Sequence, residues 1–329
     1  MEIKNVASET FSGVIGLYQK DQTLLEMPYG FRDLPNQLEN NRETLFGTAS
    51  AGKAFVAVGI MTLIEAGSIQ LTSTLAELLP DDLGVVDREI TIYELLTHTS
   101  TIQDYFDESI MEDYDELWQD FPNYRIRQNH DLYPLFIHKP VNPANRGKFQ
   151  YNNSGFVMLA SVIEAVTDKP FDEYLQVAVF EPAGMTRTGY YELDRLPANT
   201  ASAYCFDEKT QAYYTNIYSV DVKGTGAGGC LTTVGDVRRF WQALLNDRLV
   251  SAVSREQMFT QQATNGEEIY GLGFWLTELN GQLVPYFEGM DPGICFFSLY
   301  DVTREVNVIA ISNKTDNVWQ IGMDFFKQV

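Results

Sequence analysis

Ser50 and Lys53 lie three positions apart within the segment GTASAGKAF, residues 47–55. In a helix, this spacing puts a hydroxyl and an amine on one face, one turn apart. The N-terminal end of a helix has free N–H groups and a dipole that favour negative charge. A serine at that place can act as a nucleophile, because its own N–H helps to hold the oxyanion formed after attack on a carbonyl. The pair therefore predicts a nucleophilic serine with an amine beside it.

The helix that would carry this pair is predicted to be buried. Every residue in 54–64 except Thr62 is apolar or glycine, so the helix has no solvent-facing side. The run is too short to span a bilayer, and Gly67 is the predicted left-handed end of the helix. A buried helix distinguishes this Ser-x-x-Lys from the pairs that are common on solvated surfaces.

A phosphate-binding loop is the main alternative for the same segment, because residues 47–53 also spell Gly-x-x-x-x-Gly-Lys. That motif requires Ser or Thr at the next position for magnesium, and Ala54 stands there. It also requires an apolar strand directly before it, and residues 42–46 (RETLF) make a poor strand. The nucleotide-binding interpretation is therefore disfavoured.

A second informative segment is FQYNNSGF, residues 149–156. Tyr151 and Asn153 are two apart and directly precede a predicted buried helix at 155–166. A phenol and an amide could enter one cavity from this position, although a tyrosine hydroxyl satisfied at the edge of a core is more common.

Composition limits the classes of function. The chain has 329 residues, 45% of them hydrophobic and 21% charged, as in an ordinary globular protein with a sizeable core. Acidic residues outnumber basic ones 45 to 23, and the net charge of −22 argues against nucleic acid and anionic membrane surfaces as partners. The three cysteines have no metal-ligand spacing and are expected to be buried free thiols. The N-terminus lacks an apolar run, so the sequence as written predicts a cytoplasmic protein, unless a leader was removed.

The order of predicted elements favours an α+β fold. A hairpin is predicted at 12–27 and further strands at 270–276, 283–287, 294–300 and 306–312, with a final helix at 317–327. We expect one unit over 1–329, with a sheet region at about 1–75 and 200–329 and a mostly helical region at about 76–199. The acidic segment 104–120, interleaved with aromatic residues, is predicted to be an exposed amphipathic helix; a mobile wall over a pocket is the alternative.

Taken together, Ser50-x-x-Lys53 and Tyr151-x-Asn153 resemble the motifs of the serine β-lactamase and penicillin-binding protein superfamily, in the branch of class C β-lactamases, DD-peptidases and esterases. Residues 92–100, which contain Leu-Leu-Thr-His-Thr-Ser, and the glycine turn at 228–233 agree with this resemblance. It runs from about residue 12 to the C-terminus. The implied fold is β-lactamase/transpeptidase-like, an antiparallel sheet built from both termini and flanked by helices.

The third motif of that superfamily departs from the pattern. Relatives carry Lys-Thr-Gly or His-x-Gly on a strand, and this chain has Phe287-Glu288-Gly289. The resemblance places Phe287, Glu288, Gly289 and Met290 in the substrate site, with the Met290 N–H as the second oxyanion donor. The lost cation and the added Glu288 disfavour penicillins and D-Ala-D-Ala peptides, and leave neutral or cationic esters and amides as substrates.

The resemblance also implies a covalent mechanism. Ser50 attacks a carbonyl, Lys53 takes its proton in the neutral form, Tyr151 carries a proton to the leaving group, and Asn153 orients Lys53 and the substrate amide. In this scheme Tyr151 is hydrogen-bonded to Lys53. No cofactor or metal is expected, and the partner is a small-molecule or peptide substrate.

Three other functions are weaker. A Ser-His-Asp hydrolase lacks its Gly-x-Ser-x-Gly elbow, and His98 is interpreted as structural. Zinc is unsupported because His98, His130 and His138 have no ligand spacing. A non-catalytic relative that binds a peptide or glycan remains open, since the third-motif cation is missing.

Overall fold

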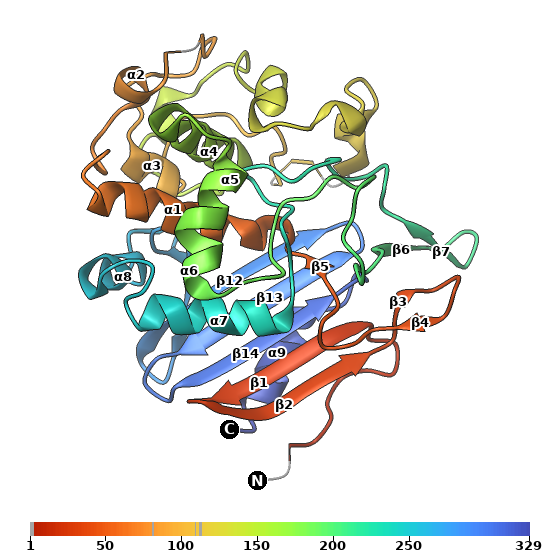
Figure 1. Ribbon diagram of the computed structural model, residues 1–329. Coiled ribbons are helices and arrows are strands. Elements are labelled where there is room, and N and C mark those ends of the chain that lie inside the picture. The colour runs from red at the N-terminus through yellow and green to blue at the C-terminus, as the bar shows by residue number, and fades with distance from the viewer. Residues whose placement is uncertain (1–2, 81, 109, 112–113) are drawn as a thin grey trace.

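The computed structural model describes residues 3–80, 82–108, 110–111 and 114–329. Its largest element is an eight-stranded sheet in the order β2-β1-β14-β13-β12-β11-β10-β9, in which neighbouring strands are antiparallel. The strands are β1 Gly13–Gln19, β2 Gln22–Tyr29, β9 Ala263–Thr264, β10 Ile269–Tyr270, β11 Trp275–Leu279, β12 Gln282–Asp291, β13 Ile294–Asp301 and β14 Val306–Ser312. The N-terminal hairpin therefore completes a sheet whose other strands come from the C-terminal part of the chain (Figure 1).

Three two-stranded pairings lie outside this sheet. They join β3 Phe31–Asp33 to β4 Leu38–Glu39, β5 Phe46–Gly47 to β8 Leu231–Thr232, and β6 Tyr204–Asp207 to β7 Ala212–Thr215. The β5–β8 pairing is the important one for the site, because it fixes the chain just before Ser50 to the chain just after the glycine-rich turn at residues 224–229.

The main sheet is covered on both faces. Successive side chains of a strand point to opposite faces, and β14 is buried along its whole length. Ile309 and Ile311 pack in a core with the helices α1 Lys53–Glu65, α4 Asn153–Thr167 and α7 Val234–Leu245, whereas Val308 and Ala310 pack in a second core with α9 Val318–Phe326.

The remaining helices are α2 Leu75–Leu78, α3 Ile92–Leu96, α5 Phe171–Leu175, α6 Glu181–Ala183 and α8 Ala252–Met258.

The predicted central helix is confirmed as α1. Ten of its side chains or glycine positions are buried, and the helix lies between the sheet and the helices α4 and α5 (Figure 1). Gly67 adopts a φ of 73° directly after the helix, which is the left-handed conformation expected of its end. Among the described helices, none is long and apolar enough to cross a membrane.

Two predictions about secondary structure were wrong. The strand expected at 270–276 is divided between β10 and β11 by a turn at Gly273, where φ is 80°. The segment 104–120 is not an amphipathic helix in its described part: it contains a 3-10 turn at Tyr114–Trp118, and aromatic burial overrides the acidic pattern. Glu112 and Asp113, which contributed to that pattern, lie outside the described residues.

Candidate active site

Ser50 lies in a 3-10 turn, Ala49–Gly52, that leads directly into α1. Ala49 is fully buried and has a φ of 46°, a conformation that costs free energy for a residue with a Cβ. The strain is held in place by the glycine-rich turn, since Gly229 N donates to Ala49 O at 3.1 Å. The turn at Ala49–Gly52 and the glycine-rich turn, which are distant in sequence, therefore together fix the backbone conformation at the predicted nucleophile.

Lys53 is the first residue of α1, and its side chain is buried. Its Nζ lies 2.9 Å from Ser50 Oγ and 2.8 Å from Asn153 Oδ1, and it donates to Ala227 O as well. Burial lowers the pKa of Lys53 to about 8, although the charges of Glu108, Asp104 and Asp291 work against this shift. A neutral amine is therefore accessible near neutral pH.

The contacts of Lys53 fit a base. A neutral amine has two N–H donors and one lone pair, and two of its three neighbours, Asn153 Oδ1 and Ala227 O, can only accept. If both N–H groups go to these oxygens, the lone pair faces Ser50 Oγ and is ready to take its proton.

Asn153 is held by Asp104. The amide Nδ2 donates to Asp104 Oδ2 at 3.0 Å and to Phe106 O at 3.3 Å, so its oxygen must face Lys53. Asp104 also accepts from the N–H groups of Asn153 and Ser154 at the start of α4, where a carboxylate is favoured. Burial raises the pKa of Asp104 to about 6, against the effect of these hydrogen bonds.

Tyr151 contacts Ser50 rather than Lys53. A side-chain hydrogen bond joins Tyr151 to Ser50, whereas Lys53 Nζ lies 5.0 Å from the centre of the phenol ring. In the described part of the chain no hydrogen bond joins Tyr151 to Lys53, so that detail of the sequence-based scheme was wrong: the polar contacts of Lys53 Nζ are with Ser50 Oγ, Asn153 Oδ1 and Ala227 O. Burial and the charge of Glu108 hold the pKa of Tyr151 well above its ordinary value, so it remains a phenol that can donate a proton.

The ring of Tyr151 is fixed by aromatic neighbours. It stacks on Trp275 with centroids 5.7 Å and planes 17° apart, and it packs against His98 at 4.7 Å. His98 is buried, and its Nδ1 accepts from Asn152 N at 3.1 Å. Burial and the charge of Lys53 keep the pKa of His98 well below its usual range, so the ring is neutral. These contacts suit a positioning role for His98.

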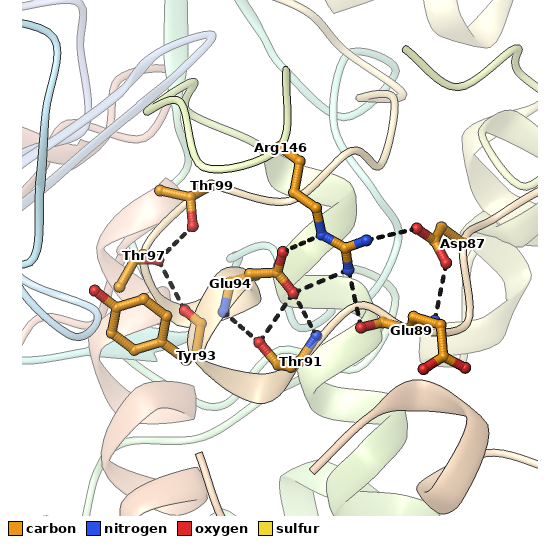
Figure 2. Close-up of polar contacts among 8 residues, drawn as sticks. All are labelled: Asp87, Glu89, Thr91, Tyr93, Glu94, Thr97, Thr99 and Arg146. Atoms are coloured by element: carbon orange, nitrogen blue, oxygen red, sulfur yellow. Dashed lines mark hydrogen bonds and ion pairs between the residues drawn. The ribbon is translucent and has the colours of Figure 1, made fainter. Parts of the chain in front are cut away.

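A polar network holds the segment before Tyr151 against α3 (Figure 2). Arg146 forms ion pairs with Glu94 at 2.6 Å and Asp87 at 3.0 Å, and donates to Glu89 O at 2.9 Å. Thr91 and Glu94 form the capping box at the start of α3. Arg146 thus ties the chain approaching Tyr151 to the helix that precedes His98.

We expect Arg146→Met to destabilise the fold by about 1 kcal/mol, because the network is partly solvated. Burial opposes ionisation of Glu94, but the hydrogen bonds from Arg146 and Thr91 outweigh it and hold the pKa of this carboxyl below its ordinary value. The contribution of the Glu94 carboxylate to the stability of the fold is therefore present above about pH 4.5 and is lost as pH falls below that value. Thermal melts at pH 7 and pH 3 test this: the difference between wild type and variant should shrink at pH 3. Arg195→Met, at an exposed arginine, is the control, and equal losses in both variants would contradict the role of the network.

Of the third-motif residues, Glu288, Gly289 and Met290 line the same cavity as Ser50. Phe287 does not, so its predicted place in the substrate site was wrong. Its side chain is 2% exposed and packs against the rings of Phe55 and Trp241. The position that carries a cation in relatives is therefore part of the aromatic core here.

A family model described as Beta-lactamase matches residues 4–319. The chain belongs to the Beta-lactamase family. A solved penicillin binding protein from Bacillus halodurans is 32% identical, with a TM-score of 0.93 over 98% of each chain. Penicillin-binding protein 4* of Bacillus subtilis is 27% identical over 93% of this chain and 69% of that protein. Teichoic acid D-alanine hydrolase of Staphylococcus aureus is 22% identical over 99% of this chain and 77% of that protein. The β-lactamase/transpeptidase-like fold predicted from the sequence is thereby confirmed.

The cavity of this Beta-lactamase family chain is strongly acidic. It has a volume of about 1420 Å³, and among the described residues that line it there is no lysine, arginine or histidine. The acidic residues that line it are Glu108, Asp221, Glu268, Glu288, Asp291 and Asp316. The same cavity holds the hydroxyl of Ser50, the predicted nucleophile, so a molecule that reaches it passes through a field that favours positive charge. No cluster of three or more His, Cys, Asp or Glu suited to a metal ion occurs within the described residues.

Sequence reasoning missed Asp104 and Ala227 as parts of this Beta-lactamase family site. The sequence placed Asp104 on an exposed acidic face. Only the folded structure brings its carboxylate within hydrogen-bonding distance of Asn153 at the start of α4, and that contact shows its role. Ala227 lies in the glycine-rich turn at residues 224–229, and it contributes through a backbone oxygen that no residue type could reveal.

Gly289 sets how closely β12 approaches the turn that carries Ser50. A Cβ at this position would lie 2.4 Å from Thr48 O and 2.6 Å from the backbone nitrogens of Ser50 and Ala51. Because all three are backbone atoms, the nucleophile turn or the strand would have to move. We expect Gly289→Ala to lower kcat for ester hydrolysis about 100-fold, since displacements near 1 Å can cost that much.

Gly235→Ala is the matched control for Gly289→Ala. Gly235 lies in α7, and a Cβ there would meet nothing closer than 3.5 Å. This variant should keep its activity and its stability, because alanine favours the helix. A Gly289→Ala enzyme as active as the control would show that the close approach of β12 does not position Ser50.

Proposed function

We propose that this chain is a serine hydrolase that works through an acyl-enzyme on esters or amides without a carboxylate near the reacting carbonyl. The observation that carries the proposal is the contact of Lys53 Nζ with Ser50 Oγ at 2.9 Å, within a set of acceptors that leaves the amine lone pair for the serine proton. The relative named teichoic acid D-alanine hydrolase supports hydrolysis as the class of reaction.

In the proposed first step, Ser50 Oγ attacks the carbonyl carbon and its proton passes to neutral Lys53. The carbonyl oxygen becomes an oxyanion, for which the N–H groups of Ser50 and Met290 are the proposed donors. Tyr151 gives its proton to the leaving group as the carbon–leaving-group bond breaks, and Lys53 restores the proton to Tyr151. In the second step, water adds to the acyl-enzyme and gives its proton to Lys53, which returns it to Ser50 as the acid leaves.

The third motif supports the choice of substrate. Phe287 is in the core, Glu288 lines the cavity, and burial followed by the charges of Glu268 and Glu108 raises the pKa of Glu288 to about 7. A substrate carboxylate placed there would lose the charge-assisted hydrogen bond that a cation provides, worth about 1.5–3 kcal/mol. Uncharged or cationic acyl compounds avoid this loss.

A fluorophosphonate probe tests the proposal. It reacts with an activated serine by displacement of fluoride, so the intact protein should gain the mass of one phosphonyl group. Digestion should place that group on the peptide containing Ser50. An unmodified protein after long incubation, or a label on another serine such as Ser154 at the head of α4, would overturn the proposal and favour a non-catalytic protein that binds a peptide or glycan.

A further inference from the structure

The six carboxylic side chains of the cavity differ in their surroundings. Glu108 and Glu268 are exposed to solvent, and Asp316 already accepts hydrogen bonds from Ser312 and Ser12. Glu288 lies on the strand beside the nucleophile. The remaining two, Asp221 and Asp291, have desolvated carboxyl groups, and neither forms an ion pair within the described residues.

Asp221 is held rigidly, yet one of its oxygens has no partner. The neighbouring carbonyls are fixed, because Val220 O accepts from Asn123 Nδ2 at 2.7 Å and Val222 O accepts from Leu193 N at 2.8 Å. Although the residue as a whole is partly exposed, its Oδ1 atom is buried and has no hydrogen-bond partner within the described residues. An unsatisfied buried carboxyl oxygen costs free energy, which a bound donor would recover.

Asp291 is the last residue of β12 and lines the same cavity as Asp221. Asn216 Nδ2 donates to Pro292 O at 2.8 Å, which ties the loop that carries Asp221 to the turn that follows β12. Burial, followed by the charge of Asp291, raises the pKa of Asp221 to about 8. Burial likewise raises the pKa of Asp291 to about 7, against the charge of Lys53. Two negative charges here oppose each other, and a cation between them would relieve that repulsion.

Two phenols complete the surroundings. Tyr105 and Tyr114 line the cavity, and their hydroxyls lie 3.4 Å apart. Burial and then the charge of Asp221 hold the pKa of each phenol well above its ordinary value, so both stay neutral. Neutral phenol oxygens accept hydrogen bonds from an ammonium, and the rings attract cations.

We propose that Asp221 and Asp291, with the hydroxyls of Tyr105 and Tyr114, form a subsite that binds a primary ammonium group on the acyl part of the substrate. The catalytic consequence of this subsite rests on the proposed function. The subsite would select one substrate class for that function: esters or amides of amino acids with a free amino group.

The position of Asp291 suits this class. Gly289 packs directly against the Ser50 backbone, and Asp291 follows two residues later on the same strand, about 7 Å further along. An aspartate side chain that points back toward the cavity spans part of this distance. An amino group close to the reacting carbonyl therefore reaches the carboxylate when the carbonyl is at Ser50.

A binding measurement tests the subsite independently of any catalysis. Ser50→Ala protein is titrated by calorimetry with alaninamide, with isobutyramide, in which a methyl group replaces the ammonium, and with methylmalonamic acid, which has a carboxylate there. We expect alaninamide to bind at least tenfold more tightly than isobutyramide and methylmalonamic acid to bind most weakly. Adding Asp221→Asn or Asp291→Asn should reduce the preference for alaninamide at least tenfold. Glu256→Gln, at an exposed acid on α8, controls for net charge and should leave it unchanged.

The catalytic consequence is then measured with Ser50 intact, using phenyl esters of alanine and of isobutyric acid. The ratio of their kcat/KM values should favour alanine and fall at least tenfold in Asp221→Asn. If the fluorophosphonate fails to label Ser50 but alaninamide binds selectively, the hydrolase proposal fails and the subsite stands. If esters are hydrolysed without preference for the ammonium, or if Glu288→Gln alone removes that preference, the Asp221–Asp291 subsite is refuted.

Discussion

Ser50→Ala is expected to lower kcat for hydrolysis of an uncharged aryl ester by at least about 1,000-fold, and up to about 10⁶-fold. The reason is that Ser50 carries the only hydroxyl hydrogen-bonded to Lys53 among the described residues. Without the oxygen, the acyl-enzyme cannot form, and only binding and the oxyanion donors remain. Release of the phenol, followed by absorbance, measures the effect.

The fold should survive this change. Ser50 is partly exposed, and its loss removes one hydroxyl from the edge of the cavity rather than from the core. A melting temperature within a few degrees of wild type is the control for folding. Activity retained in a folded Ser50→Ala protein would remove Ser50 from the mechanism.

The sequence predicted the parts of the site that depend on local pattern. Ser50 and Lys53 share one turn before an apolar helix, and Tyr151 and Asn153 precede another, so spacing, hydropathy and the resemblance to the superfamily together made these four residues candidates. The pairing of the two terminal regions in one sheet was predictable as well, because alternating strands lie at both ends of the chain.

What the sequence could not provide are the contacts between distant segments. The alignment of Phe287 with the cation of the third motif gave its position on the strand but not the direction of its side chain. Successive side chains of a strand point to opposite faces, and here the ring of Phe287 lies in the core while Glu288 lines the cavity. Phe287→His would therefore bury a polar ring rather than supply a cation to the substrate. The hydrogen bond between Tyr151 and Ser50 likewise depends on the contacts of Lys53 with Asn153 and Ala227, which no motif specifies.

The strain at Ala49 is a further feature without a sequence signal. Alanine at a φ of 46° is tolerated here because Gly228 and Gly289 let the glycine turn and β12 press on the nucleophile turn from two sides. A Cβ at Gly228 would lie 2.4 Å from Ala49 O. Gly228 and Gly289, which are remote from each other in sequence, therefore support the strained backbone of Ala49. Only the way the three residues come together in the fold explains the strain and the two glycines.

Lys53→Arg is expected to lower kcat/KM by about 1,000-fold or more, because a guanidinium stays protonated and cannot accept the proton of Ser50. Arginine keeps the positive charge, so the variant separates a base from a merely electrostatic role. Lys327→Arg, at an exposed lysine after α9, is the matched control and should behave as wild type.

The pH profile of the wild-type enzyme tests the same role. Since burial lowers the pKa of Lys53 to about 8, the neutral base becomes more abundant as pH rises through about 8, and kcat/KM should rise with it and then level off. The charged form is the one that burial penalises, so the folded state binds its proton less tightly than the unfolded chain does. Stability relative to Lys53→Met should consequently increase between about pH 8 and the ordinary lysine pKa of about 10.5. An active Lys53→Arg enzyme with an unchanged pH profile would show that the proton goes elsewhere, and Tyr151, already hydrogen-bonded to Ser50, would be the group to test next.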